Sequence, residues 1–293
     1  MLQTIDLTRR FGDLTAVDQV SLDVPDGTLT GFVGANGAGK TTTMRLITGV
    51  LGSHAGQVLW QGRPITAADR RRFGYMPEER GLYPKQPVLD QLIYLGRLTG
   101  LSATAARSRA GALLERFGLA DRTRERVEKL SLGNQQRVQI IAAVIASPVA
   151  LILDEPFSGL DPVAVEQMAD IVREHAANGL PVLFSSHQLD LVERLCDRVA
   201  IMSRGRLITQ GRVEDLRRTT TPRYRLALDV DAGWVRDAPG VSTLDVDGSS
   251  ALIELDDPEA SRHLLREALS RGQIREFSPV VPSLTELYKE VAA

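Results

Sequence analysis

The segment GANGAGKT, residues 34–41, has the spacing G-x-x-x-x-G-K-[ST]. Gly34 and Gly39 allow backbone N–H groups to wrap around phosphate oxygens, and the N-terminus of a following helix adds positive charge. Lys40 is expected to reach the β- and γ-phosphates, and the Thr41 hydroxyl to ligate Mg²⁺. The spacing therefore predicts a site for the phosphates of a nucleotide.

Two acidic residues and a histidine follow apolar runs later in the chain. The segment LILDEP, residues 151–156, places Asp154 at the carboxyl end of a buried strand, where ligands of open α/β sheets bind. Asp154 suits Mg²⁺, directly or through water. Glu155 should point to the opposite side, as neighbours on a strand do, and can take a proton from an attacking water. His187 ends the next apolar strand and is expected near the same edge.

A second helix start, in the segment LSLGNQQR at 130–137, also has the residues to face an anion. Ser131 and Gly133 are expected in a tight turn that caps the helix, but no lysine and no strand-to-loop pattern accompany them. Two such starts in one chain are explained if they serve different nucleotides. In a two-fold dimer, each glycine loop would face the other chain's Ser131 helix, with ATP between them.

The choice of base depends on weaker signals. Phe11, in the segment RRFGD, is expected in an early loop, where its ring can stack on an adenine. A buried loop aromatic is the alternative interpretation. No N-K-x-D segment occurs, so the sequence does not support guanine specificity.

Strands that alternate with helices should position these residues. The pattern predicts an α/β fold with a mainly parallel sheet covered on both faces. Strands are expected at 21–24, 28–33, 149–153 and 181–185, and helices at 41–49, 87–99, 104–117, 134–146, 163–177 and 188–195.

The composition changes near the polar segment RRTTTPRY. We predict a nucleotide-binding domain at 1–216, a linker at 217–222 and a small α+β domain at 223–293. The last helix should open with a capping box formed by Ser283 and Glu286. This small domain can stabilise a dimer, regulate its closure or cover an apolar edge.

The overall composition excludes several classes of protein. A net charge of −2 argues against bulk binding to nucleic acid, and the single cysteine excludes an internal disulfide and a cysteine zinc site. The beginning lacks the apolar core of a signal peptide, so we expect a cytoplasmic protein. The most apolar stretch, 140–153, is too short to span a bilayer and reads as a buried helix and strand. Any link to a membrane should come through a partner chain.

Taken in order, the segments GANGAGKTT, LSLGNQQ, LILDEP, SGLD and SSH resemble the motifs of ABC transporter ATPase subunits, over about residues 1–216. The resemblance implies a P-loop NTPase domain with a mixed sheet and a helical subdomain that carries the signature motif. It also implies ATP and Mg²⁺ as cofactors and a homodimer with ATP at its interface. The tract GYMPEERGLYP and the C-terminal domain are similar to the NatA-like, drug-export branch. Proteins of that branch pair with a separate ABC-2-type membrane permease.

The resemblance also assigns roles to residues. Phe11 corresponds to the adenine-stacking aromatic, Asp161 to a dimer-contact loop and His187 to a γ-phosphate switch. Ser131 and Gly133 correspond to the signature motif, which closes on the opposite subunit's ATP. The implied nucleotide-binding set is Phe11, Gly34, Ala35, Asn36, Gly37, Ala38, Gly39, Lys40, Thr41, Thr42, Glu78, Ser131, Gly133 and Asp161. The implied metal ligands are Thr41, Asp154 and Glu78, and the implied catalytic residues are Glu155, His187 and Lys40.

Glu78 departs from the family pattern, which usually has glutamine after Y-x-P. A glutamate beside a γ-phosphate must bind the metal, pair with a cation such as Arg80, or stay swung out until a partner closes the site.

Three functional classes remain open from the sequence. The first is an ATPase that powers an exporter and lies on the inner face of the cell membrane through its permease. The alternatives are a non-transport ATPase in translation or DNA repair, and a soluble ATP switch. The cargo cannot be read from this chain, because the membrane partner selects it.

Overall fold

The computed structural model describes residues 1–79, 81–218, 222–280 and 283–292, and it divides the chain into two compact units. The first is Met1–Arg212 and the second is Val213–Val291. Of the expected linker at 217–222, residues 219–221 lie outside the described residues, as does Arg80.

A six-stranded sheet forms the centre of the first unit, in the order β11-β10-β4-β9-β8-β7. Neighbouring strands from β10 to β7 are parallel, and β11 pairs antiparallel with β10. The strands are β4 (Leu29–Val33), β7 (Phe73–Met76), β8 (Ala150–Leu153), β9 (Val182–Ser186), β10 (Arg198–Ser203) and β11 (Arg206–Arg212). The predicted mainly parallel sheet is confirmed, and its carboxyl edge carries the motif residues.

A second sheet of the same unit has antiparallel pairing and the strand order β2-β1-β5-β6, and β3 pairs with β1. Its strands are β1 (Leu2–Phe11), β2 (Leu14–Val20), β3 (Asp23–Val24), β5 (Ala55–Trp60) and β6 (Arg63–Pro64). The strand expected at 21–24 is confirmed in part, because β3 contains its last two residues. The expectation that Phe11 lies in a loop is wrong, since it is the last residue of β1.

One apolar core joins the two sheets through α1 (Lys40–Thr48). Met44 and Ile47 of this helix pack with Leu2 and Val17 from the smaller sheet and with Phe32 from the larger one. The packing fixes the helix that follows the glycine loop. It therefore also fixes Lys40, the first residue of that helix.

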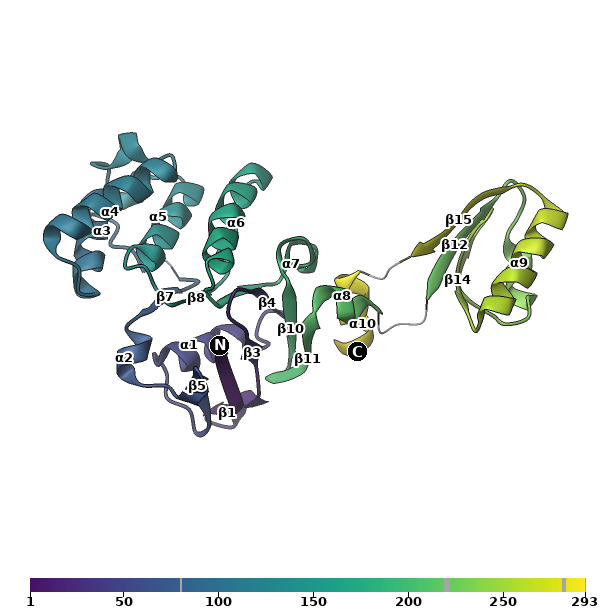
Figure 1. Cartoon of the computed structure of the whole chain (residues 1–293), viewed down its shortest axis with the longest axis horizontal. Coiled ribbons are helices and arrows are strands. Elements are labelled where there is room, and N and C mark those ends of the chain that lie inside the picture. Colours follow the sequence, from purple (N-terminus) through teal and green to yellow (C-terminus); the bar gives the residue numbers. More distant parts are fainter. Residues whose placement is uncertain (80, 219–221, 281–282, 293) are drawn as a thin grey trace. The chain divides into compact units, whose positions relative to one another are not determined.

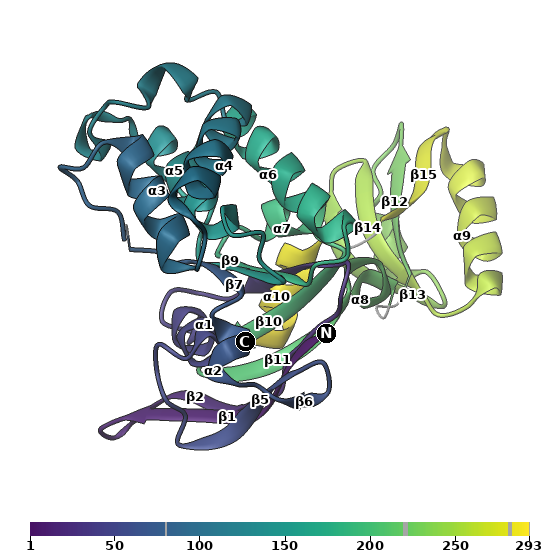
Figure 2. The same ribbon diagram turned by 60° about the vertical axis from the view of Figure 1, so that its left-hand side comes forward.

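Three helices, α3, α4 and α5, pack against one another and form a separate group above the sheets in both views (Figures 1 and 2). This is the helical subdomain that the resemblance implies. The remaining helices of the unit are short or lie along the larger sheet. The bounds are α2 (Ala67–Arg70), α3 (Val88–Leu98), α4 (Ala103–Arg116), α5 (Leu132–Val144), α6 (Pro162–Ala177) and α7 (Leu189–Leu195), with 3-10 turns η1 (Ala120–Arg122) and η2 (Val127–Lys129).

The second unit contains an antiparallel sheet in the order β13-β14-β12-β15, with α9 packed against it. Leu226, Ile253 and Leu264 are buried in its own core. At the start of the last helix, Ser283 and Glu286 exchange backbone-to-side-chain bonds of 3.2 and 2.9 Å, so the predicted capping box is confirmed. The elements are α8 (Val213–Arg218), β12 (Arg223–Leu228), η3 (Gly233–Asp237), β13 (Val241–Asp247), β14 (Ser250–Leu255), α9 (Pro258–Arg271), β15 (Ile274–Val280) and α10 (Leu284–Ala292).

Candidate active site

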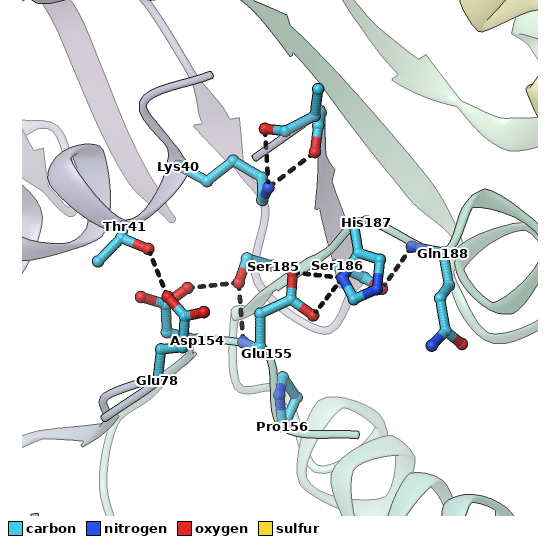
Figure 3. Close-up of polar contacts among 12 residues, drawn as sticks. Lys40, Thr41, Glu78, Asp154, Glu155, Pro156, Ser185, Ser186, His187 and Gln188 are labelled. Atoms are coloured by element: carbon cyan, nitrogen blue, oxygen red, sulfur yellow. Dashed lines mark hydrogen bonds and ion pairs between the residues drawn. The ribbon is translucent and has the colours of Figure 1, made fainter. Parts of the chain in front are cut away.

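The glycine loop connects β4 to α1, as its sequence predicts. The Lys40 ammonium is buried inside the loop and donates to the carbonyls of Gly34 at 2.7 Å and Ala35 at 3.3 Å (Figure 3). These bonds hold a compact cation beside the backbone N–H groups of the loop. The arrangement suits an anion with several oxygens.

Two glycines of the loop are required by close backbone packing. A Cβ at Gly34 would lie 2.3 Å from the Met202 carbonyl oxygen, and one at Gly39 would lie 2.4 Å from the Ala16 carbonyl oxygen. Gly39 also has φ of 105°, and Gly37 has φ of 80° with open space around it. Gly37 is therefore required by its positive φ. Gly34 and Gly39 are required because neighbouring strands approach them closely, and Gly39 has a positive φ as well.

A cavity of about 370 Å³ opens in front of the loop and reaches from the smaller sheet to the end of β8. Apolar residues line one end, and loop and carboxylate residues line the other. Three residues of the glycine loop that belong to the predicted set do not line it: Gly34, Ala35 and Ala38. The lining residues are Phe11, Leu14, Ala16, Asn36, Gly37, Gly39, Lys40, Thr41, Thr42, Glu78 and Glu155.

Asp154 lies directly after β8 and is fully buried. Its Oδ1 accepts a hydrogen bond of 2.5 Å from the Ser185 hydroxyl. Within the described part of the chain, Oδ2 has no hydrogen-bond partner. An unpartnered buried carboxylate oxygen fits a hard cation. Sequence reasoning missed Ser185, although it is the second residue of the segment FSSH.

Glu155 and His187 form a pair at the same edge (Figure 3). His187 Nδ1 lies 3.1 Å from both carboxylate oxygens of Glu155, and the Glu155 N–H donates to Ser185 Oγ at 2.8 Å. Burial raises the pKa of Glu155, and the bond to His187 opposes that rise in part. A carboxylate with a raised pKa is a better proton acceptor.

The direction of Glu155 has a different cause from the one predicted. Strand alternation does not separate it from Asp154, because β8 ends at Leu153. Glu155 instead has φ of 49°, in the left-handed region that is uncommon for a non-glycine residue. The surrounding bonds hold this strained turn at the point where the two carboxylates diverge.

Glu78 lies close to the predicted metal ligand Thr41. The Thr41 hydroxyl donates to Glu78 Oε2 over a long 3.4 Å. Among the described residues, no cluster of three or more His, Cys, Asp or Glu side chains could hold a metal ion. A metal here would therefore need the Thr41 hydroxyl and phosphate oxygens beside the carboxylates.

The second group of predicted residues caps helices and does not line the cavity. Ser131 is the N-cap of α5 and its Oγ accepts from the Asn134 N–H at 3.4 Å, while Asp161 caps α6 and accepts from Ala164 N at 2.9 Å. Gly133 was expected in a turn, but it lies in the first turn of α5, because the helix begins at Leu132. The structure of one chain thus leaves Ser131, Gly133 and Asp161 outside the cavity.

A residue that the sequence did not reveal ties α5 to the carboxylate loop. The buried Gln136 side chain donates to the carbonyl oxygens of Glu155 at 3.1 Å and Pro156 at 2.9 Å. No local pattern could predict this contact, because it joins positions 19 and 20 residues apart.

Phe11 is 45% exposed and lines the apolar end of the cavity. The interpretation as a buried aromatic is therefore wrong. The exposed face of an aromatic ring is suited to stacking on a planar base.

Comparisons with known proteins agree with this geometry. The family described as "ABC transporter" matches residues 17–158, and the family described as "ATP-binding protein DrrA1-3-like, C-terminal domain" matches residues 211–292. The uncharacterized ABC transporter ATP-binding protein YhaQ of Bacillus subtilis (strain 168) is 40% identical over 289 residues, covering 98% of this chain and 97% of that protein. The chain belongs to the ATP-binding subunits of ABC transporters. Members of this family bind ATP and hydrolyse it to power transport, and this subunit is accordingly an ATPase.

Two further relatives of the ATP-binding subunit are informative. The daunorubicin resistance ATP-binding protein DrrA3 of Streptomyces coeruleorubidus is 37% identical over 215 residues, covering 72% of this chain and 68% of that protein. A solved structure of an ATP-binding subunit of an ABC transporter matches with a TM-score of 0.69 and 32% identity, covering 75% of this chain and 92% of that chain. The predicted fold class is confirmed. No helix in the described ranges of the subunit is long and apolar enough to cross a bilayer.

Proposed function

We propose that this ATP-binding subunit energises a separate ABC-2-type permease that exports its cargo. Residues 1–216 carry the catalytic role, from the cytoplasmic face of the membrane. The match of 211–292 to a DrrA1-3-like domain and the similarity to a daunorubicin resistance protein support export. An ion, a drug and a peptide all fit, since the permease contacts the cargo.

The pair of Glu155 and His187 is the observation that carries the hydrolytic role. Glu155 takes a proton from the water that attacks the γ-phosphate, and its raised pKa suits it to that task. His187 Nδ1, 3.1 Å away, orients the carboxylate and leaves the rest of its half-exposed ring for the phosphate. Lys40 places its ammonium against the β- and γ-phosphates.

The residues at the metal position fit Mg²⁺. The unpartnered Asp154 Oδ2, the Thr41 hydroxyl and Glu78 are hard oxygen donors, as this ion prefers. When bound, Mg²⁺ would neutralise charge on the phosphates of ATP. The proximity of Glu78 to Thr41 favours its assignment as a metal ligand over a swung-out position.

Two copies of the chain complete the site in this proposal. Ser131 and Gly133 of one copy face the γ-phosphate held by the Lys40 loop of the other, and Asp161 contacts the same region. A two-fold arrangement gives two equal composite sites. The N-terminus of α5 supports this role, because the backbone N–H groups and the dipole at the start of a helix attract an anion.

An apolar groove supports docking of the permease next to the metal position. The groove of about 360 Å³ is lined by residues of β7, α3 and α5 and by Gly81 and Leu82, which follow Glu78 in sequence. Leu98, also in the lining, is 65% exposed. A permease segment that fills this groove would contact the loop that carries Glu78.

The composite site is tested with the variant Glu155→Gln, which keeps the phosphate contacts and loses the base. With ATP and Mg²⁺ it should elute as a dimer in size-exclusion chromatography, and with ADP as a monomer. Wild type with the same nucleotides is the control. A monomer under every condition would contradict the dimer.

A further inference from the structure

Arg9 lies over the ring of Phe11. The guanidinium carbon is 4.9 Å from the ring centroid. Both residues belong to β1. At its end, Arg9 Nη1 donates to the Gly52 carbonyl oxygen at 2.8 Å. The side chain is therefore held both by the ring and by the loop after α1.

The two sides of the Phe11 ring have different neighbours. Phe11 lines the cavity together with Leu14 and Ala16, but Arg9 is absent from the lining. Arg9 thus covers the ring from outside the cavity. The part of the ring that faces the cavity stays open to a planar group.

The loop that holds Arg9 also braces the backbone of β1. His54 N donates to the Thr8 carbonyl oxygen at 2.9 Å, and Arg10 N donates to His54 Nδ1 at 3.1 Å. This loop directly follows α1, whose first residue is Lys40. Helix α1 therefore connects Lys40 to the loop that holds Arg9 against the Phe11 ring.

We propose that Arg9 is a positioning residue for the base of the nucleotide. It holds the Phe11 ring in the orientation in which an adenine stacks on the cavity-facing side. The proposal rests on the stacking role of Phe11. A cation over an aromatic face attracts the ring and restrains its rotation. A ring that is ordered beforehand loses less conformational entropy when the base binds, so ATP binds more tightly.

The variant Arg9→Ala tests this in the full-length protein. Its Kd for ATP, by calorimetry, and its KM should rise roughly three- to tenfold, while kcat stays unchanged. Binding of inorganic tripolyphosphate, which has no base, should not change. Arg10→Ala is the matched control, since its bond to His54 uses the backbone. Arg9→Lys, with the charge but without the planar group, should lie between wild type and Arg9→Ala.

A double-mutant cycle with Phe11→Ala separates positioning from other roles. If Arg9 acts through the ring, Arg9→Ala adds nothing to the loss caused by Phe11→Ala. An equal loss in both backgrounds, or an equal loss of tripolyphosphate binding, would overturn the proposal. Unchanged ATP affinity in Phe11→Ala would remove the stacking role and the positioning role together, and leave ATP binding by the Lys40 loop intact.

Discussion

Two helices of the first unit begin with residues suited to an anion, and they differ in what surrounds them. α1 begins at the buried Lys40, behind a cavity lined by eleven residues that include Glu155. α5 begins after the exposed Ser131, with Leu132 45% exposed, and lines no part of that cavity. The N-terminus of α1 thus lies in a cavity with other site residues, whereas the N-terminus of α5 lies on an open surface. The difference agrees with the proposal that the second helix serves the nucleotide of another copy of the chain.

The largest expected effect comes from removing the general base beside the α1 site. Glu155→Gln should lower kcat roughly 10²- to 10⁴-fold, because a general base is lost while the phosphate contacts remain. Phosphate release under saturating ATP measures it, with Glu115→Gln as a control for the loss of an acidic charge. Turnover close to wild type would show that another group acts as the base.

Removing the cation from the α1 side should have the next largest effect. Lys40→Ala should weaken ATP binding roughly 10- to 100-fold, since a charge-assisted contact to the phosphates disappears. Calorimetry measures the affinity, and the exposed Lys85→Ala is the matched control. Unchanged affinity would place the phosphates away from this loop.

The α5 side is tested by removing its capping hydroxyl. Ser131→Ala should leave ATP binding by the monomer unchanged but weaken the ATP-dependent dimer roughly tenfold, because a contact to the partner's γ-phosphate is lost. Analytical ultracentrifugation gives the dimer affinity.

Ser102→Ala is the matched control, since Ser102 caps α4 in the same way, accepting from Ala105 N at 3.2 Å. Both variants should lose about 1 kcal/mol of stability as a lost cap does. An equal loss of dimer in both would reduce Ser131 to a helix cap.

The smallest effect concerns stability and pH. Because burial raises the pKa of Glu155, the folded state keeps this proton to a higher pH than the unfolded chain does. Ionising Glu155 therefore costs stability as pH rises above its ordinary value of 4.5. Glu155→Gln removes that cost, so near pH 8 the variant should melt about 2 °C above the wild type. Near pH 4 the variant and the wild type should melt at the same temperature. A difference that is the same at both pH values would contradict a raised pKa.

The sequence predicts the helices well and the first hairpin poorly. α6 occupies 162–177 where 163–177 was expected, because its apolar positions follow a clear helical period. The β1–β2 hairpin escapes the same reasoning, since register shifts between Leu7 and Arg9 and positive φ at Asp6 and Gln19 break the alternation of a strand. These irregularities place Phe11 at a strand end instead of a loop.

The site divides in a similar way. The motif residues on the α1 side are predictable because each depends on a local turn at the end of a strand. Ser185 and Gln136 are not, because their bonds to Asp154 and Glu155 join distant segments. The conformation of Glu155 also depends on those bonds, so its direction could not be derived from strand alternation.

The two bonds of Gln136 have a consequence for cooperativity in the proposed dimer. α5 meets the partner's nucleotide at its first turn, while Gln136, one turn further on, holds the carbonyls of Glu155 and Pro156 in its own chain. When the partner's nucleotide displaces α5, the displacement is thereby passed to Glu155, the general base that acts on the nucleotide bound by its own chain. The two sites then share a coupling free energy, and hydrolysis should depend on ATP concentration with a Hill coefficient above one.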